Sequence, residues 1–236
     1  MGRHFEVRAA AMAKTGAMKS ALYARASREI YMAAKSGIPD PANNLALRSA
    51  IDKFKGQSVP RDVIDRAIKK AQGGDVETYE SGRYEAFGPS NSLLIIDTLT
   101  DNVNRAFVEI RTLVTKKGGH MGTVAYNFTE AGVLVFKHDN KAQVEETLIL
   151  GDVDVREISE DGGVIEVIVE PTSFGRAKDL LNDLRIEEFI VAEIRMIPND
   201  TLTLKDEELS KFQELIDGLD ELQDVQNVFH NVALDE

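Results

Sequence analysis

The chain of 236 residues contains no cysteine and no tryptophan. The absence of cysteine excludes disulfides, thiolate zinc sites and a cysteine nucleophile, and it is typical of proteins from a reducing compartment. Hydrophobic runs are short, as at 93–96, whereas a membrane span needs roughly 18 apolar residues. We therefore expect a cytoplasmic protein that has no membrane partner.

Residues that support catalysis are also scarce. The four histidines, His4, His120, His138 and His230, are scattered and form no pair at metal-ligand spacing. Neither a Gly-x-Ser-x-Gly elbow nor a dinucleotide fingerprint occurs. The sequence therefore predicts no enzyme, no bound metal, no cofactor and no small-molecule substrate.

Charge is divided unevenly along the chain. Residues 1–72 hold 14 Lys+Arg against 6 Asp+Glu, whereas residues 73–236 hold 14 against 34. The overall net charge of -12 hides this asymmetry. A basic end on an acidic body indicates a polyanionic partner for the basic end, and the alternative is a merely solvated basic surface.

The basic end is predicted to be a domain of three helices. A helix over 18–36 stops at Gly37, and Asp40-Pro41 offers an N-cap and first-turn proline for a second helix that ends near Lys55. Pro60 opens a third, in which apolar residues recur at helical spacing until Gly73-Gly74.

The remainder alternates strands and helices. The middle segment predicts strands over 83–87, 92–99 and 124–128 with a helix over 104–117 between the last two. From 132 to 198 the order is strand, helix, strand, strand, helix, strand, which is the ferredoxin-like βαββαβ order.

The last segment predicts one amphipathic helix and one strand over 225–232, which cannot form a domain alone. We expect it to return and complete the middle domain. The predicted class is α+β with three domains: a basic helical domain (1–74), a middle α/β domain (75–130 plus 200–236), and a ferredoxin-like α/β domain (131–199) inserted in the middle one.

Basic side chains on the helical domain are the candidate contacts to nucleic acid. Arg25, Arg28 and Lys35 lie within about an 80° arc of one helix at 100° per residue. Such a cluster suits phosphate contacts, because lysine and arginine displace condensed counterions, and the alternative is a solvated face. The other candidates lie upstream or in a glycine-rich segment: Arg3, Arg8, Lys14, Lys19, Lys116, Lys117 and His120.

Two polar loops each allow two interpretations. The segment 116–123, Lys-Lys-Gly-Gly-His-Met-Gly-Thr, is either a glycine-terminated helix end or a loop that presents its cations to a partner. It is no Walker motif, because no Gly-Lys-Ser/Thr closes it. The segment 100–105, Thr-Asp-Asn-Val-Asn-Arg, is either a helix cap or a recognition loop.

Several segments resemble the YebC/PmpR family, which includes a mitochondrial translational activator of cytochrome oxidase. They are 59–68, 83–89, 100–105, 118–128 and 224–231, which span nearly the whole chain in order. The opening residues and 29–41 look closest to the YeeN branch. The resemblance implies three domains, one interrupting another, and a regulator of gene expression. Two features depart from the family pattern: His4-Phe5-Glu6 replaces a tryptophan signature, and the loop 118–123 is shorter.

The leading hypothesis is a DNA-binding transcriptional regulator. The alternative is a ribosome-associated translation factor that binds structured ribosomal or transfer RNA and relieves stalled, proline-rich synthesis. A third is a protein-interaction scaffold. We also predict that replacing Arg25, Arg28 and Lys35 by glutamate leaves folding intact and weakens nucleic-acid binding.

Overall fold

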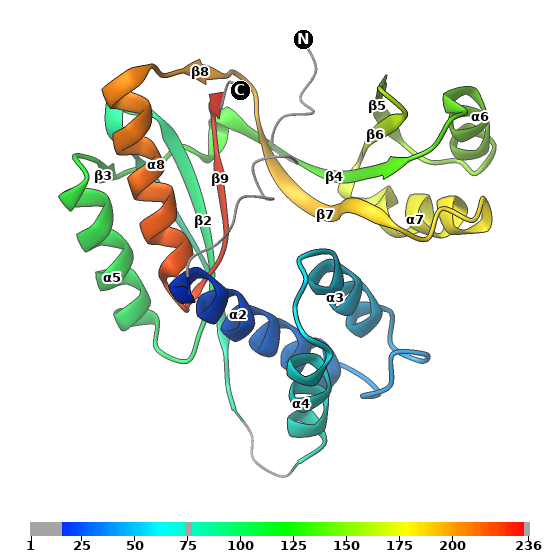
Figure 1. Cartoon of the computed structure of the whole chain (residues 1–236), viewed down its shortest axis with the longest axis horizontal. Coiled ribbons are helices and arrows are strands. Elements are labelled where there is room, and N and C mark those ends of the chain that lie inside the picture. The colour runs from blue at the N-terminus through cyan, green and yellow to red at the C-terminus, as the bar shows by residue number, and fades with distance from the viewer. Residues whose placement is uncertain (1–15, 74–76, 234–236) are drawn as a thin grey trace. The chain divides into compact units, whose positions relative to one another are not determined.

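The computed structural model describes residues 16–73 and 77–233, with side chains from Lys19 onward. These residues form two compact units, each with its own core. Residues 128–197 make up one unit. The other unit combines the helical segment with the α/β segments that precede and follow residues 128–197 in the sequence (Figure 1). The fold is α+β with three domains, as predicted. The exact domain limits stay a prediction.

The helical domain consists of α2 (Gly16–Lys35), α3 (Leu45–Gly56) and α4 (Arg61–Gln72). Its buried residues come from all three helices, among them Ile30, Leu47 and Ile64. One predicted boundary is wrong, because α3 is capped by Asn44, whose side chain accepts a hydrogen bond from the Leu47 N–H. Asp40 instead forms a turn that precedes the helix.

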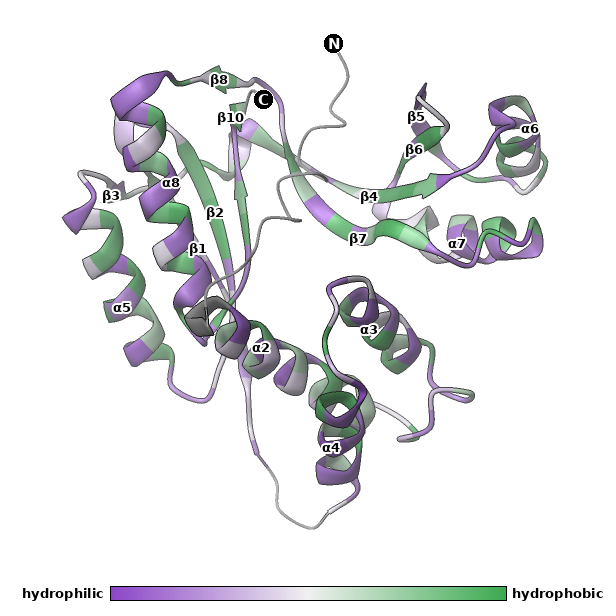
Figure 2. Cartoon of the chain, in the orientation of Figure 1, coloured by the Kyte–Doolittle hydropathy of each residue, from purple (hydrophilic) through white to green (hydrophobic). Residues whose placement is uncertain are grey.

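The middle domain is built on a sheet with the order β3-β1-β2-β9. Strand β2 (Leu93–Thr100) is central and hydrophobic along most of its length (Figure 2). The last strand, β9 (Val225–His230), pairs antiparallel with it, so the C-terminal segment does return to this domain. The other paired strands are β1 (Glu80–Phe87), β3 (His120–Met121), β8 (Leu202–Thr203) and β10 (Val232–Ala233), the last two with each other.

Two helices, α5 (Val103–Lys116) and α8 (Asp206–Glu221), pack against each other in this domain. Gly218 of α8 allows the close approach, because a Cβ there would lie 3.0 Å from the Leu113 side chain. The predicted strand over 124–128 is wrong: Ala125–Asn127 is a 3-10 turn, and the third strand is the two-residue β3.

The inserted unit comprises β4 (Phe128–Lys137), α6 (Lys141–Leu150), β5 (Val155–Asp161), β6 (Val164–Val169), α7 (Phe174–Asp183) and β7 (Phe189–Pro198). Its sheet has the order β5-β6-β4-β7, in which the first and third strands are central. The predicted ferredoxin-like order is therefore confirmed. Gly162 and Gly163, both at positive φ, form the turn between β5 and β6.

Candidate nucleic-acid interface

Arg25 does not face solvent. It is only 6% exposed, and its guanidinium donates to the Asp220 carboxylate at 3.2 Å and to the Asp220 carbonyl at 3.1 Å. An arginine that is buried and paired in this way has few donors left, so this structure does not favour a contact between Arg25 and phosphate, which stays a prediction. Its bonds fasten α2 to the C-terminal end of α8.

Arg28 is bound in the same way. Its Nη1 donates to Asp224 Oδ1 at 2.6 Å and to the Gln223 carbonyl at 2.6 Å, and its guanidinium carbon lies 5.5 Å from the centre of the Tyr79 ring. The side chain is 13% exposed. This structure therefore does not favour a phosphate contact of Arg28 either, because the protein's own carboxylate occupies its guanidinium, and that contact also stays a prediction.

The Asp224 carboxylate accepts hydrogen bonds from arginines of two helices, Arg28 of α2 and Arg105 of α5. The Asp224 side chain is 2% exposed and accepts from Arg105 at 2.8 Å from Nη2 and 3.1 Å from Nε. Arg105 in turn donates to Asp101 at 2.6 Å, which lowers the pKa of the Asp101 carboxyl, while Asp101 and Asp224 together raise the pKa of the guanidinium. The arginines on α2 and α5 thus share one buried carboxylate.

The loop that carries Asp101 has a structural role. The Asn102 side chain accepts from the Arg105 N–H at 3.0 Å and caps α5. Of the two interpretations of segment 100–105, the capping one is therefore confirmed. Asp101 and Arg105 are engaged with each other rather than presented to a partner.

Lys53 is half-buried and pairs with Glu29 at 3.1 Å. Apart from Arg25 and Arg28, the other described basic side chains of the helical domain are exposed, but only some lack an acidic partner. Arg61, Arg66 and Lys70 pair with Asp65, Asp62 and Glu77, respectively. Arg48 donates to two backbone carbonyls in the turn before α3. Among the described residues of the helical domain, the exposed lysines with no ion pair are Lys19, Lys35, Lys55 and Lys69. Arg3, Arg8 and Lys14 lie outside the described residues.

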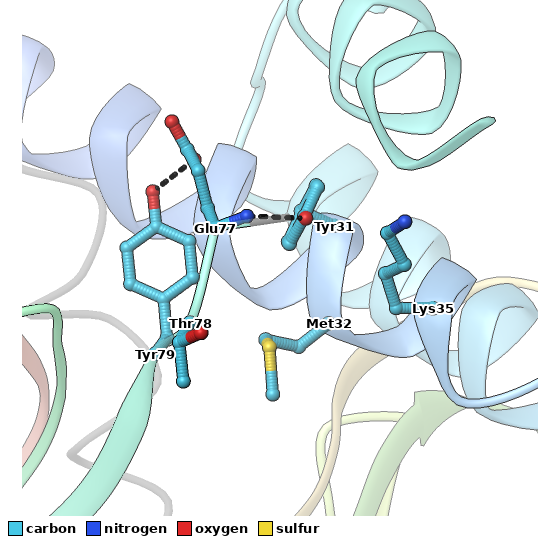
Figure 3. A pocket seen from close by; sticks show the side chains of 6 residues that line it. All are labelled: Tyr31, Met32, Lys35, Glu77, Thr78 and Tyr79. Carbon is cyan, nitrogen blue, oxygen red and sulfur yellow. Dashed lines mark hydrogen bonds between the residues drawn. The ribbon is translucent and has the colours of Figure 1, made fainter. Parts of the chain in front are cut away.

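Lys35, the last residue of α2, borders a pocket of about 210 Å³ (Figure 3). Its Nζ lies 5.9 Å from the centre of the Tyr31 ring. Across the pocket, the Glu77 N–H donates to the Tyr31 hydroxyl at 3.0 Å, and the Tyr79 hydroxyl donates to the Glu77 carboxylate at 2.6 Å. Burial, followed by the nearby Glu77 carboxylate, raises the pKa of Tyr79 to about 12. The Glu77 carboxylate is thus already bound, and Lys35 keeps an exposed ammonium group.

The glycine segment after α5 ends the helix. Gly118 adopts a φ of +85° directly after Lys117, which suits a glycine-terminated helix end. Lys117 pairs with Glu214 of α8 at 2.6 Å, whereas Lys116 is exposed and forms no ion pair with another described residue. His120 is exposed and stacks on Phe87, with the ring centres 4.9 Å apart.

The predictions missed one prominent residue, Tyr126, whose side chain is 72% exposed. A strand would have placed it on the same face as Val124 and Phe128, which are both buried, but the 3-10 turn directs it outward. The turn is held by Glu85, whose Oε2 accepts from the N–H groups of Val124 and Ala125, each at 2.6 Å. Strand β1 therefore anchors both Tyr126 and His120.

Within 16–73 and 77–233, no three His, Asp or Glu side chains are grouped so that they could hold a metal ion. Over the same ranges, no helix combines the length and the apolar character that crossing a membrane requires.

These features define a three-domain α+β protein, in which arginines tie a helical domain to an α/β domain that carries a ferredoxin-like insertion. Family comparison matches residues 3–74 to the TACO1/YebC protein N-terminal domain and residues 79–232 to the TACO1/YebC second and third domain. The chain belongs to this family, as the resemblance to YebC/PmpR proteins predicts.

Individual relatives match over almost their whole length. The chain is 49% identical to the "Probable transcriptional regulatory protein Mfl546" of Mesoplasma florum and 48% identical to a "Probable transcriptional regulatory protein" of Mycoplasma capricolum, covering 99% of this chain and 100% of the relative in both cases. A crystal structure of the conserved hypothetical protein Aq1575 from Aquifex aeolicus is similar, with a TM-score of 0.75, 29% identity, and coverage of 94% of this chain and 93% of that one.

Proposed function

We propose that the chain is a nucleic-acid-binding regulator of transcription that contacts phosphates through its helical domain. The observation that carries the proposal is the set of exposed lysines without ion pairs on that domain: Lys19, Lys35, Lys55 and Lys69. Such lysines can displace counterions from a nucleic-acid backbone. The names of the Mesoplasma and Mycoplasma relatives support a role in transcription.

The mode of binding differs from that of a helix-turn-helix protein. A recognition helix reads bases with residues at its N-terminal end, but Arg61 and Asp62 at the start of α4 are engaged in ion pairs with Asp65 and Arg66. Backbone contacts and shape would therefore supply most of the affinity, and sequence preference would be weak.

A second candidate function is RNA binding in translation, and Tyr126 favours it. An exposed aromatic ring can stack on an unpaired base, which RNA loops and ends present and duplex DNA does not. His120, which stacks on Phe87, and the exposed Lys116 belong to the same domain and add a second ring and a cation.

Binding titrations across salt concentration test the proposal. The triple variant K35E/K55E/K69E should bind nucleic acid more weakly and flatten the dependence of log K on log salt by about 2.7, which is three phosphate contacts at about 0.9 each. The matched control K137E/R176E/R185E makes the same charge change on exposed residues of the inserted unit. Equal slopes for the two variants would refute phosphate binding by the helical domain.

The two functions are separated by the choice of target. Duplex DNA and structured RNA are titrated in parallel, and lysate is sedimented through sucrose with and without RNase. Tight DNA binding without ribosome association supports transcription regulation. Sedimentation with ribosomes that RNase abolishes, without a DNA complex at moderate salt, supports the translational role instead.

A further inference from the structure

The C-terminal end of α6 carries two adjacent, strongly exposed hydrophobic residues. Ile149 is 70% exposed and Leu150 is 79% exposed, whereas Val144 and Leu148 of the same helix are fully buried. Single exposed apolar residues are common on protein surfaces. Two consecutive branched side chains that contribute nothing to their own core are less so, and contiguous exposed apolar surface marks interaction sites.

The apolar surface continues onto α7. Gly151 follows the pair, and a Cβ at this glycine would lie 2.1 Å from Leu180 Cδ1, so the Leu180 side chain packs directly on the backbone there. Leu180 is itself half-buried. We call Ile149, Leu150 and Leu180 the α6 tip.

Carboxylates frame the α6 tip. Glu146 lies three and four residues before Ile149 and Leu150, which places it next to both on the helix surface. Asp152 follows the tip, and Asp183 lies three residues after Leu180; all three acids are exposed. The last turn of α6 contains no basic residue, so the partial negative charge of its terminal carbonyls adds to theirs.

The whole unit of residues 128–197 also carries a net negative charge. Residues 128–197 hold 16 Asp+Glu and 7 Lys+Arg. Nucleic acid is therefore repelled from this unit. Two copies joined symmetrically through the tip would also bring like charges together, which opposes self-association.

We infer that the α6 tip is a docking site for a basic amphipathic segment of another protein. The partner's apolar side chains would cover Ile149 and Leu150, and its lysines or arginines would pair with Glu146, Asp152 and Asp183. An apolar centre with a charged rim is the usual arrangement of a protein interface. The site shares no residue with the proposed nucleic-acid surface, so either proposal can fail without the other.

The inference is tested on the full chain with a synthetic helical peptide that has leucines on one face and lysines on the other, using fluorescence anisotropy. The variant I149S/L150S should weaken binding roughly tenfold or more, as expected for the loss of a central anchor. E146Q/D152N should weaken it less and reduce its salt dependence. The control V103S/V108S, at exposed positions of α5, should bind like the unmodified chain.

Other results would overturn the inference. Unchanged peptide affinity in I149S/L150S would do so, as would equal binding of a peptide that has lysines but no leucines. A dimer in sedimentation that I149S/L150S dissociates would identify a second copy as the occupant. Flotation with lipid vesicles that the same variant abolishes would identify a membrane surface.

Discussion

Arg28 and Asp224 form an ion pair of 2.6 Å between α2 and the start of β9, although 196 residues separate them in sequence. Arg105 shares the same carboxylate. The helical domain is therefore fixed to the middle domain by charge as well as by apolar packing, and the arginines expected at the nucleic acid hold the protein together instead.

Replacing Asp224 by alanine leaves two arginines without their buried partner. We expect this change to lower the free energy of unfolding by about 3 kcal/mol, because removing one member of a buried ion pair strands the other. Urea denaturation measures it. The control Glu221→Ala, at an exposed position three residues earlier, should change stability by less than about 0.5 kcal/mol; equal losses would show that the pair is not stabilising.

Glutamate substitutions in the predicted basic arc of Arg25, Arg28 and Lys35 should differ in their effect on stability. Lys35→Glu changes an exposed side chain and should leave the unfolding midpoint unchanged while weakening nucleic-acid binding. Arg25→Glu and Arg28→Glu place a second carboxylate beside Asp220 or Asp224 and should destabilise the fold. Thermal denaturation of the single variants decides, and three equal midpoints would contradict the structure.

Tyr126→Ala removes an exposed ring and should not affect folding. If Tyr126 stacks on an unpaired base, the change should weaken binding of single-stranded or looped RNA roughly tenfold, because one stacked base contributes about 1–3 kcal/mol. Duplex DNA binding should change little. Tyr126→Phe keeps the ring and serves as the control; an RNA affinity that falls equally in both variants would exclude stacking.

Tyr79 should ionise late in an alkaline titration. Its pKa is raised to about 12 from about 10, so the folded state favours the neutral phenol. This contribution to stability is complete below pH 10 and is lost as the pH rises from about 10 through 12. Ultraviolet difference spectra should show one phenol of the five tyrosines titrating near 12, and Tyr79→Phe should remove it.

Replacing Gly118 and Gly175 by alanine should change the free energy of unfolding in opposite directions, although an added Cβ would meet open space at both. Gly118 adopts a φ of +85°, so Gly118→Ala should cost about 1 kcal/mol even though nothing lies within 4 Å. Gly175, in the first turn of α7, has similar space and no positive φ. Gly175→Ala should stabilise by about 0.5 kcal/mol in urea denaturation, and a loss at both sites would point to packing rather than backbone strain.

The sequence predicted the fold well where periodicity and turn residues agree. The βαββαβ order of the insertion and the return of the C-terminal helix and strand both follow from apolar spacing. The errors arose from single side chains that hydrogen-bond to the backbone. Asn44 caps α3 in place of Asp40, and the Glu85 carboxylate turns residues 125–127 into a 3-10 turn; an alternating apolar pattern does not reveal a bond to a distant strand.

The candidate site was harder to predict for an electrostatic reason. Charge counted along a sequence does not show which cations are neutralised by carboxylates far away in the chain. Arg25 and Arg28 lie on the same arc as Lys35, but that side of α2 meets Asp220 and Asp224 of the acidic segment. On the described part of α2, Lys19 and Lys35 rather than Arg25 and Arg28 remain available for a polyanion.

The two ends of the insertion meet at a hydrogen bond: the Asn199 N–H donates to the Asn127 carbonyl at 2.8 Å. Because residues 127 and 199 lie side by side, the middle domain needs only a short connection between its two segments, whatever sequence is inserted there. During evolution, the inserted domain could therefore be replaced or change in length or charge without altering the fold of the middle domain. If both proposed surfaces bind partners, selection on the inserted domain would then leave recognition by the helical domain undisturbed.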